Sequence, residues 1–227
     1  MTNLIYICGM LSQAEENYLK ALFHLTSETA DKQEAGTNEL AATLNVKPAT
    51  ANDMLKKLKE KKLIVYEKYG KISLSTAGKK QAIEVVRKHR LWETFLYEKL
   101  AFSWDEVHEV AEQLEHIHSP KLIEQLEKFL GYPEVDPHGD IIPNAKGEIK
   151  LQARKTLSQI VVGKSCKLVA VKDNTASFLQ YVIKVGLGLS SKIRIVSRQD
   201  FDGTMEIDVN GKKSIVSQKF AENIYVV

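Results

Sequence analysis

The sequence predicts a mainly α fold with β structure: an N-terminal winged helix-turn-helix, a helical middle region and a C-terminal small, barrel-like β domain. Apolar residues recur with helical periodicity as far as Gly131, whereas short β-rich runs begin near Leu151. A linker rich in proline and glycine lies between them. We therefore expect domains at residues 10–75, 76–140 and 141–227, with the linker inside the last range.

Length and composition indicate an ordinary soluble globular protein. The chain has 227 residues, enough for two domains or three small ones, and 44% of them are hydrophobic. Its two cysteines, Cys8 and Cys166, are far apart and form no disulfide framework, so we expect a reduced, cytoplasmic setting. The apolar residues 4–8 are too short to span a membrane and resemble no targeting signal. Met10 is an alternative natural start.

The first 62 residues predict a helix followed by a helix-turn-helix. Residues 12–28 predict an amphipathic helix, and Thr37 or Asn38 is placed to cap a second helix over 39–44. Pro48 suits the first turn of a third helix, where its missing N–H costs nothing. Apolar residues of that helix face inward and polar ones outward, which is typical of a DNA-reading helix.

Two predicted strands, 63–66 and 71–74, with a turn at Tyr69 and Gly70, add a wing to this motif. In a major groove Asn52 would hydrogen-bond base edges, while lysines would neutralise phosphates. A solvated polar face is the alternative for these residues. The DNA-contacting set that we predict is Lys47, Pro48, Thr50, Asn52, Lys56 and Lys59.

The middle region predicts three helices. Thr76 is placed to cap a long helix reaching about Leu100, and residues 103–106 form a capping box for the next. Ser119 and Pro120 begin a third helix, which Gly131 ends. Long helices rich in Trp, Phe and Leu favour a homodimer interface, with an intrachain core as the alternative.

The C-terminal region predicts an all-β domain. Asp202-Gly203 and Asn210-Gly211 are strong hairpin-turn signals. The strand-like runs are residues 167–171, 192–196, 204–209 and 213–216.

Potential metal ligands repeat at helical spacing in residues 108–116. Relative to His108, the side chains of Glu112, Glu115 and His116 lie within an arc of about 100°. His89 and Glu93 repeat the i, i+4 spacing one helix earlier. Residues 92–140 carry 12 acidic side chains against three lysines, and five of the six histidines fall within residues 89–138. Such a block suits divalent cations, although solvated helical faces or a polar network remain alternatives.

These motifs resemble the diphtheria toxin repressor family. The winged helix is followed by Arg-Lys-His-Arg-Leu at residues 87–91, by His-x₃-Glu-x₂-Glu-His at 108–116 and by Pro-His-Gly at 137–139, and then by the β domain. The resemblance covers nearly the whole chain. It implies an iron- or manganese-activated repressor with a winged-helix DNA-binding domain, a helical dimerisation domain and an SH3-like C-terminal domain.

The resemblance also implies two metal sites. It assigns Asn17, Glu112, Glu115 and His116 to a primary regulatory site. It assigns His89, Glu93 and His108 to an ancillary site, with Asp173 as a further candidate ligand. For His118 and His138 a structural role is expected instead.

Two of these positions depart from the family pattern. Asn17 stands where the family usually has Asp or Met, although its amide oxygen can bind a metal. Glu112 replaces the Cys of the iron-responsive type, as in the manganese-responsive type. A site of oxygen and nitrogen ligands suits Mn²⁺ or Fe²⁺, whereas Zn²⁺ or Co²⁺ would bind more tightly in vitro without being the signal.

The function predicted is a metal-dependent repressor that binds operator DNA as a homodimer, and the resemblance implies that it controls metal-uptake genes. An iron-responsive global regulator of the same family and a winged-helix regulator without metal control are the alternatives. A metalloenzyme is disfavoured, because the sequence has no HExxH motif and no convincing nucleophile.

Overall fold

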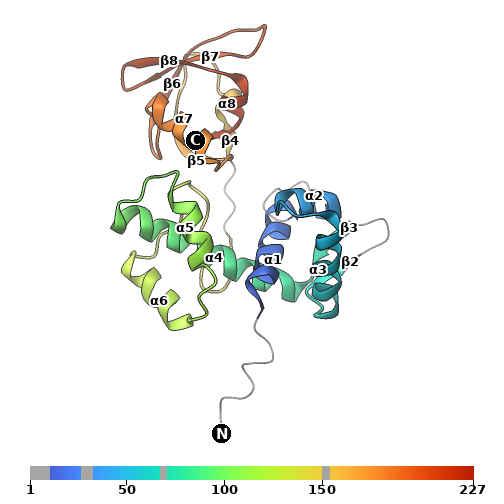
Figure 1. The fold of residues 1–227 in the computed structure, drawn as a ribbon. Coiled ribbons are helices and arrows are strands. Elements are labelled where there is room, and N and C mark those ends of the chain that lie inside the picture. The colour runs from blue at the N-terminus through green and yellow to red at the C-terminus, as the bar shows by residue number, and fades with distance from the viewer. Residues whose placement is uncertain (1–10, 27–32, 67–70, 150–153) are drawn as a thin grey trace. The chain divides into compact units, whose positions relative to one another are not determined.

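The computed structural model describes residues 11–26, 33–66, 71–149 and 154–227 (Figure 1). The chain forms two compact units. The first comprises residues up to 88 together with 115–118 and 143–148, and the second comprises the remaining residues from 89 onward. In the described part, no helix has the length and apolar character needed to cross a membrane.

The first unit holds the predicted helix-turn-helix and its wing. Its elements in chain order are α1 (Gln13–Thr26), β1 (Ala35–Gly36), α2 (Thr37–Thr43), α3 (Pro48–Glu60), β2 (Ile64–Tyr66), β3 (Lys71–Leu74) and the first part of α4 (Thr76–Leu100). The strands form an antiparallel sheet in the order β1-β3-β2. The sequence did not predict β1, and the predicted turn at residues 69–70 lies outside the described residues.

The core of this unit explains the apolar periodicity of its helices. Fully buried side chains come from α1, α2, α3 and β3, and include Leu19, Leu22, Leu40, Leu55, Leu58 and Ile72. Gly78 in α4 permits a close approach of the wing, since a Cβ there would lie 1.9 Å from the carbonyl oxygen of Leu63.

The starts of α2 and α4 lie one or two residues earlier than predicted. Gly36 rather than Thr37 or Asn38 precedes α2, and its N–H donates to Glu39 Oε2 at 3.3 Å. Thr76 is the first residue of α4, and the cap is the hydroxyl of Ser75, which accepts from the Gly78 N–H at 3.0 Å. Pro48 occupies the first turn of α3, as predicted.

Helical elements of the second unit follow the predicted caps. They are the remainder of α4, α5 (Val107–Leu114) and α6 (Pro120–Phe129). The Ser103 N–H donates to Glu106 Oε2 at 2.8 Å ahead of α5, and Ser119 accepts from the Leu122 N–H at the start of α6. Gly131, with φ of +76°, follows the end of α6, where a left-handed residue is favourable.

A six-stranded sheet forms the C-terminal part of the second unit. Its strands pair in the order β4-β9-β5-β6-β7-β8. The elements are β4 (Lys155–Thr156), β5 (Ser165–Val171), α7 (Ala176–Val185), β6 (Lys192–Arg198), β7 (Met205–Val209), β8 (Lys212–Val216), α8 (Gln218–Glu222) and β9 (Ile224–Val226). The four predicted strands are present as β5 to β8, whereas the two helices, β4 and β9 were not predicted. Asn210 and Gly211 both have positive φ between β7 and β8, as the predicted hairpin requires.

Candidate metal centre

Within the first unit, residues after α5 contact the first helix. His116 Nδ1 lies 2.5 Å from Glu16 Oε2, and Lys20 Nζ lies 2.7 Å from Glu115 Oε1. Glu16 and Lys20 share one face of α1 because they are four residues apart. The side chains of Glu115 and Glu16 are 0% and 4% exposed. We call these four residues the α1 cluster.

The charges of the α1 cluster balance through these contacts. Lys20 places an ammonium on the buried Glu115 carboxylate, and Lys88 Nζ lies 3.7 Å from Glu16 Oε1. The other nitrogen of His116, Nε2, faces Glu115 Oε1 at 3.8 Å. Two carboxylates and an imidazole thus converge where cationic side chains supply the counter-charge, and buried carboxylates need such a partner.

Asn17, the predicted first-helix ligand, fits a cation-binding role. In the described part its Oδ1 atom is buried and has no hydrogen-bond partner. An unpaired buried amide oxygen costs roughly 1–3 kcal/mol, a penalty that coordination to a cation would remove. Carboxylate, imidazole and amide oxygen together form a donor set that suits Mn²⁺ or Fe²⁺.

A second cluster lies between α4 and α5 in the second unit. Glu93 Oε1 is 2.9 Å from His89 Nε2 and 3.2 Å from His108 Nδ1. The two imidazole rings meet edge to face, with centroids 4.9 Å apart. Glu112 Oε1 is 3.5 Å from His108 Nε2. We call His89, Glu93 and His108 the α4–α5 cluster.

Glu93 in this cluster is set up to stay ionised. Burial opposes the negative charge, but His89, His108 and His138 outweigh it and hold the pKa of Glu93 well below its usual value. An ionised carboxylate between two imidazoles is a suitable set of ligands for a divalent cation. One ligand atom from each of the three residues lies within 4.8 Å of the others.

The predicted ligands are therefore distributed over both units. Asn17, Glu115 and His116 belong to the first, and Glu112 belongs to the second, near the α4–α5 cluster. Asp173 accepts a hydrogen bond from the Thr175 N–H at 2.9 Å, just before α7. Among the described residues, Asp173 belongs to none of the groups whose ligand atoms converge.

Sequence reasoning missed Glu16 and Lys20. Both are charged residues on the apolar side of α1 that are less than a tenth exposed. On a helical wheel of α1 both lie within about 60° of the buried Phe23, which was the available signal. Their partners, 95 and 100 residues away in sequence, were not readable from local spacing.

The predicted DNA-reading residues lie on one helix and its start. Lys47 precedes the first turn of α3 and is exposed, as are Pro48, Thr50, Lys56 and Lys59. Asn52 is half-buried. Lys56 pairs with Asp53 at 3.0 Å, and Lys59 Nζ lies 5.8 Å from the ring centroid of Tyr66 in the wing.

Comparison with known proteins identifies the class of protein that combines a DNA-reading helix of this kind with metal ligands. Three family models match in succession. The iron-dependent repressor N-terminal DNA-binding domain matches residues 10–72. The iron-dependent repressor metal-binding and dimerisation domain matches residues 75–144. The FeoA domain matches residues 155–227.

Individual relatives agree with these models. A helix-turn-helix-type transcriptional regulator of Methanocaldococcus jannaschii is 33% identical over 120 residues, which are 53% of this chain and 94% of that protein. The iron-dependent repressor IdeR of Mycobacterium leprae is 30% identical over 133 residues, or 59% of this chain, and the match spans about half of that relative, 56%. A solved manganese-dependent transcriptional repressor in complex with manganese is 31% identical, with a TM-score of 0.84 over 94% of this chain and 99% of that one.

The fold and its ligand clusters thus define a metal-regulated DNA-binding protein. The chain belongs to the iron-dependent repressor family, the family of the diphtheria toxin repressor, and is a metal-dependent transcriptional repressor. It carries the N-terminal DNA-binding domain, the dimerisation domain and the C-terminal FeoA domain of that architecture.

Proposed function

We propose that this repressor binds operator DNA as a homodimer when Mn²⁺ is available, and that it controls genes of metal uptake. The observation that carries the proposal is the contact of Glu115 and His116 with α1. Helix α1 packs against α2 and β3, so it is part of the framework that holds the DNA-reading helix. Binding of a cation by these ligands would therefore act directly on the framework that positions α3, the DNA-reading helix.

The proposed regulatory ligands are Asn17, Glu112, Glu115 and His116, and Glu16 now joins them because it contacts His116. A bound divalent cation would supply the positive charge that lets these carboxylates approach each other. Lys20 and Lys88 already place positive charge beside Glu115 and Glu16. The ligand residues then orient the segment 115–118 on α1 according to the cation that they hold. Coupling of this kind is reciprocal between metal and DNA and is typically about 1–3 kcal/mol.

Mn²⁺ is the proposed effector because the ligand set is built from oxygen and nitrogen. Glu112 stands where the iron-responsive type carries a thiolate, and one of the solved relatives is a manganese complex. The ancillary site proposed is His89, Glu93 and His108, with Asp173 retained as a weaker candidate. Fe²⁺ is the second candidate effector, since the M. leprae relative is an iron-dependent repressor.

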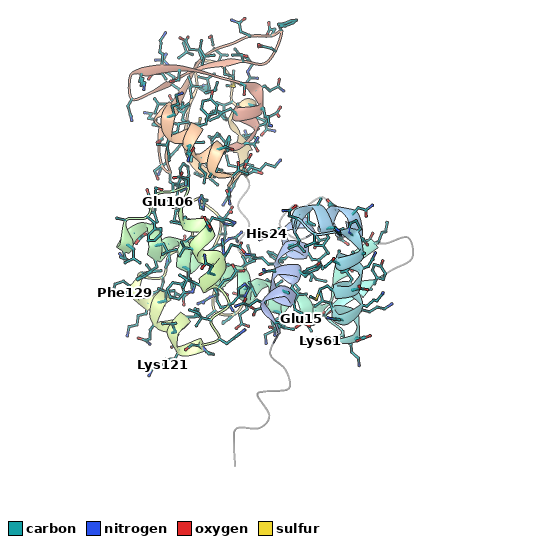
Figure 2. The ribbon with its side chains drawn as sticks, viewed as in Figure 1. Glu15, His24, Lys61, Glu106, Lys121 and Phe129 are labelled. Carbon is teal, nitrogen blue, oxygen red and sulfur yellow. The ribbon has the colours of Figure 1, made fainter. Side chains whose placement is uncertain are left out.

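Exposed apolar side chains support the homodimer. Leu100 at the end of α4, Leu122 in α6 and Phe129 at the end of α6 are 52%, 39% and 65% exposed. Figure 2 shows Phe129 projecting outward from its unit. Contiguous exposed apolar surface marks interaction sites, and these side chains would contribute to such a surface. A symmetric pair would present two α3 helices to half-sites about 34 Å apart, or a multiple of that.

On DNA, the charged and the uncharged polar residues of α3 would make different kinds of contact. Lys47, Lys56 and Lys59 would contact phosphates and set affinity, while Asn52 would read a base edge. Thr50 and Pro48 lie at the exposed start of the helix, where the backbone would approach the groove.

The test is capture of fragmented genomic DNA of the source organism by purified protein under anaerobic conditions. Parallel samples contain Mn²⁺, Fe²⁺ or a chelator. Discrete fragments recovered more strongly with Mn²⁺ support the proposal, and stronger recovery with Fe²⁺ transfers it to the iron-responsive alternative. Equal recovery with the chelator contradicts metal control.

A further inference from the structure

The turn between β6 and β7 carries the most exposed large apolar side chain in the described part of the chain. Phe201 is 99% exposed, so its ring makes almost no contact with its own domain. Asp200 and Asp202 flank it in the sequence and are exposed as well. Neither carboxylate forms an ion pair with a described residue. We call residues 200–202 the β6–β7 knob.

Hydrogen bonds within the turn fix the shape of the β6–β7 knob. The Gln199 N–H donates to the Thr204 carbonyl at 2.8 Å, and the Gly203 N–H donates to the Gln199 carbonyl at 2.9 Å. The Thr204 N–H donates to Asp202 Oδ1 at 2.9 Å and lowers the pKa of that carboxyl, which is therefore ionised at neutral pH. A turn that is already ordered loses little conformational entropy when it binds a partner.

The chemistry of the β6–β7 knob restricts the partners that it fits. Its two carboxylates oppose an approach to DNA phosphates and, in the same way, to anionic lipid headgroups. An apolar ring between two carboxylates is instead complementary to an apolar hollow that has cationic groups at its rim. The fitting partner is therefore a protein surface of that kind.

The domain that carries the β6–β7 knob also has such a hollow, beside β4, the start of β5 and β9. Its volume is about 510 Å³, and its apolar wall includes Ile160, Val161, Val226 and Val227. Val161 and Val227 are 70% and 63% exposed.

The charge of this hollow is opposite to that of the knob. Its charged side chains are those of Lys155 and Lys164, which are exposed and form no ion pair with a described residue. The carboxyl group of Val227 is the single negative group of the lining, so the net charge stays positive. We call the six residues named in these two paragraphs the β4–β9 hollow.

We infer that the β6–β7 knob of one copy of this chain binds in the β4–β9 hollow of a second copy. Phe201 would fill the hollow, and its two acidic neighbours would face the two lysines. Among the exposed aromatic residues of the described part, Phe201 alone has an acidic residue on each side in the sequence. Every chain carries both surfaces, so copies can exchange knobs in pairs or join in a row.

This contact would join homodimers rather than form them. The proposed homodimer uses the ends of α4 and α6, whereas the knob and the hollow belong to the C-terminal sheet and its loops. Each homodimer would carry two knobs and two hollows, so homodimers on neighbouring operator sites would bind cooperatively. This consequence rests on the proposed homodimer, but the contact itself does not, and the experiments separate the two.

The first experiment measures self-association of the full chain by analytical ultracentrifugation over a range of protein concentrations. Phe201→Ser should weaken the association beyond the homodimer by roughly 30-fold or more, as loss of a central aromatic residue does. Ile183→Ser is the matched control, because Ile183 is an apolar residue of α7 in the same domain and is 47% exposed. A wild type that associates no further than Phe201→Ser overturns the inference.

Charge reversal tests the pairing itself. Asp200→Lys with Asp202→Lys should abolish the association, and so should Lys155→Glu with Lys164→Glu. All four changes in one chain should restore it, because each knob then again meets a hollow of opposite charge. All four positions are exposed, so these variants should fold like wild type. A combined variant that is folded but does not associate overturns the proposed pairing.

The second experiment places the photocrosslinking residue p-benzoylphenylalanine at position 201 and mixes this protein with isotope-labelled wild type. Crosslinks should reach residues 155–164 or 226–227 of the labelled chain, as identified by mass spectrometry. Repeating the experiment in Phe129→Glu, which disrupts the proposed homodimer, keeps the two proposals distinct, because the crosslinks should persist there. Crosslinks confined to the same chain, or none at all, overturn the inference and leave the homodimer untouched.

Discussion

At the scale of single residues, the charges around Glu115 are expected to determine both the stability of this protein and its response to metal. The side chain of Glu115 is fully buried, and Lys20 is its ion-pair partner. Removing one partner of a buried ion pair is far more damaging than replacing both, because an unpaired charge remains. Each residue of the α1 cluster therefore has a separable effect on stability and on the response to metal.

Replacing Glu115 with alanine should weaken Mn²⁺-dependent DNA binding, and it should also lower the stability of the fold because Lys20 loses its buried carboxylate. The loss corresponds to the coupling free energy of about 1–3 kcal/mol, or roughly 5- to 150-fold in operator affinity. Fluorescence anisotropy with a labelled operator, with and without Mn²⁺, measures it. Glu109→Ala is the control, because Glu109 is exposed on the neighbouring α5. A normal Mn²⁺ response in Glu115→Ala contradicts the assignment of this ligand.

Replacing Lys20 with methionine should lower the stability of the metal-free chain by about 3–5 kcal/mol, since Glu115 loses its buried ammonium. Added Mn²⁺ should then stabilise the variant more than it stabilises wild type. Thermal unfolding with and without Mn²⁺ checks both effects. An Mn²⁺-induced rise in Tm no larger than that of wild type would show that Lys20 does not compete with the cation.

At the scale of elements, ion pairs and exposed lysines tie the DNA-reading helix to its surroundings. Glu15 near the start of α1 pairs with Lys61 just after α3 at 2.6 Å, and Figure 2 marks both residues. Lys47 stands exposed before the first turn of α3. The Glu15–Lys61 ion pair links the start of α1 to the end of α3. The exposed side chain of Lys47 can contact a phosphate of bound DNA.

The Glu15–Lys61 pair should make stability depend on acidity. Burial opposes the charge, but Lys61 and Ser12 prevail and lower the pKa of Glu15 below its ordinary 4.5. A lowered folded-state pKa means that this stabilisation is complete above 4.5 and is lost as pH falls through the folded value. Glu15→Gln should therefore remove about 1 kcal/mol or less at neutral pH.

Urea unfolding at neutral pH and below pH 4.5 measures this difference. The gap between wild type and Glu15→Gln should narrow on acidification. A gap that stays constant over this range would mean that the pair does not link protonation to stability.

Lys47→Ala should weaken binding to all DNA sequences alike. The slope of log affinity against log salt should fall in magnitude by about 0.9, the value for one phosphate contact. Binding titrations at several salt concentrations give that slope for operator and random DNA. Lys192→Ala serves as the control, since Lys192 is exposed in β6 of the C-terminal sheet. An unchanged slope in Lys47→Ala would remove this residue from the phosphate contacts.

At the scale of the whole molecule, function is expected to depend on pairing two chains. The apolar residues at the ends of α4 and α6 remain exposed in one chain, and Phe95 and Phe129 pack with their ring centroids 6.1 Å apart. Aromatic surface residues of this kind carry much of the energy of an interface.

Phe129→Glu should shift the protein from dimer to monomer, because it places a charge in the proposed interface. Operator affinity should fall with it, since one half-site is then lost per binding event. Analytical ultracentrifugation and anisotropy, both with saturating Mn²⁺, measure the two effects. A variant that stays dimeric, or a wild type that is monomeric on operator DNA, contradicts the proposed interface.

The sequence by itself determined the local features of this protein. The long helices and the four longer strands of the C-terminal sheet follow from periodicity, caps and turn residues, which act over a few positions. The helical spacing of the candidate ligands from His108 to His116 is also visible in the sequence itself. The short strands β1, β4 and β9 were not predicted, because their pairing partners are distant in sequence. Tertiary structure alone decided that Glu16 and Lys20 meet His116 and Glu115. It also decided that Glu93 turns its second oxygen toward His138, since both arrangements depend on packing between helices and loops that no local pattern encodes.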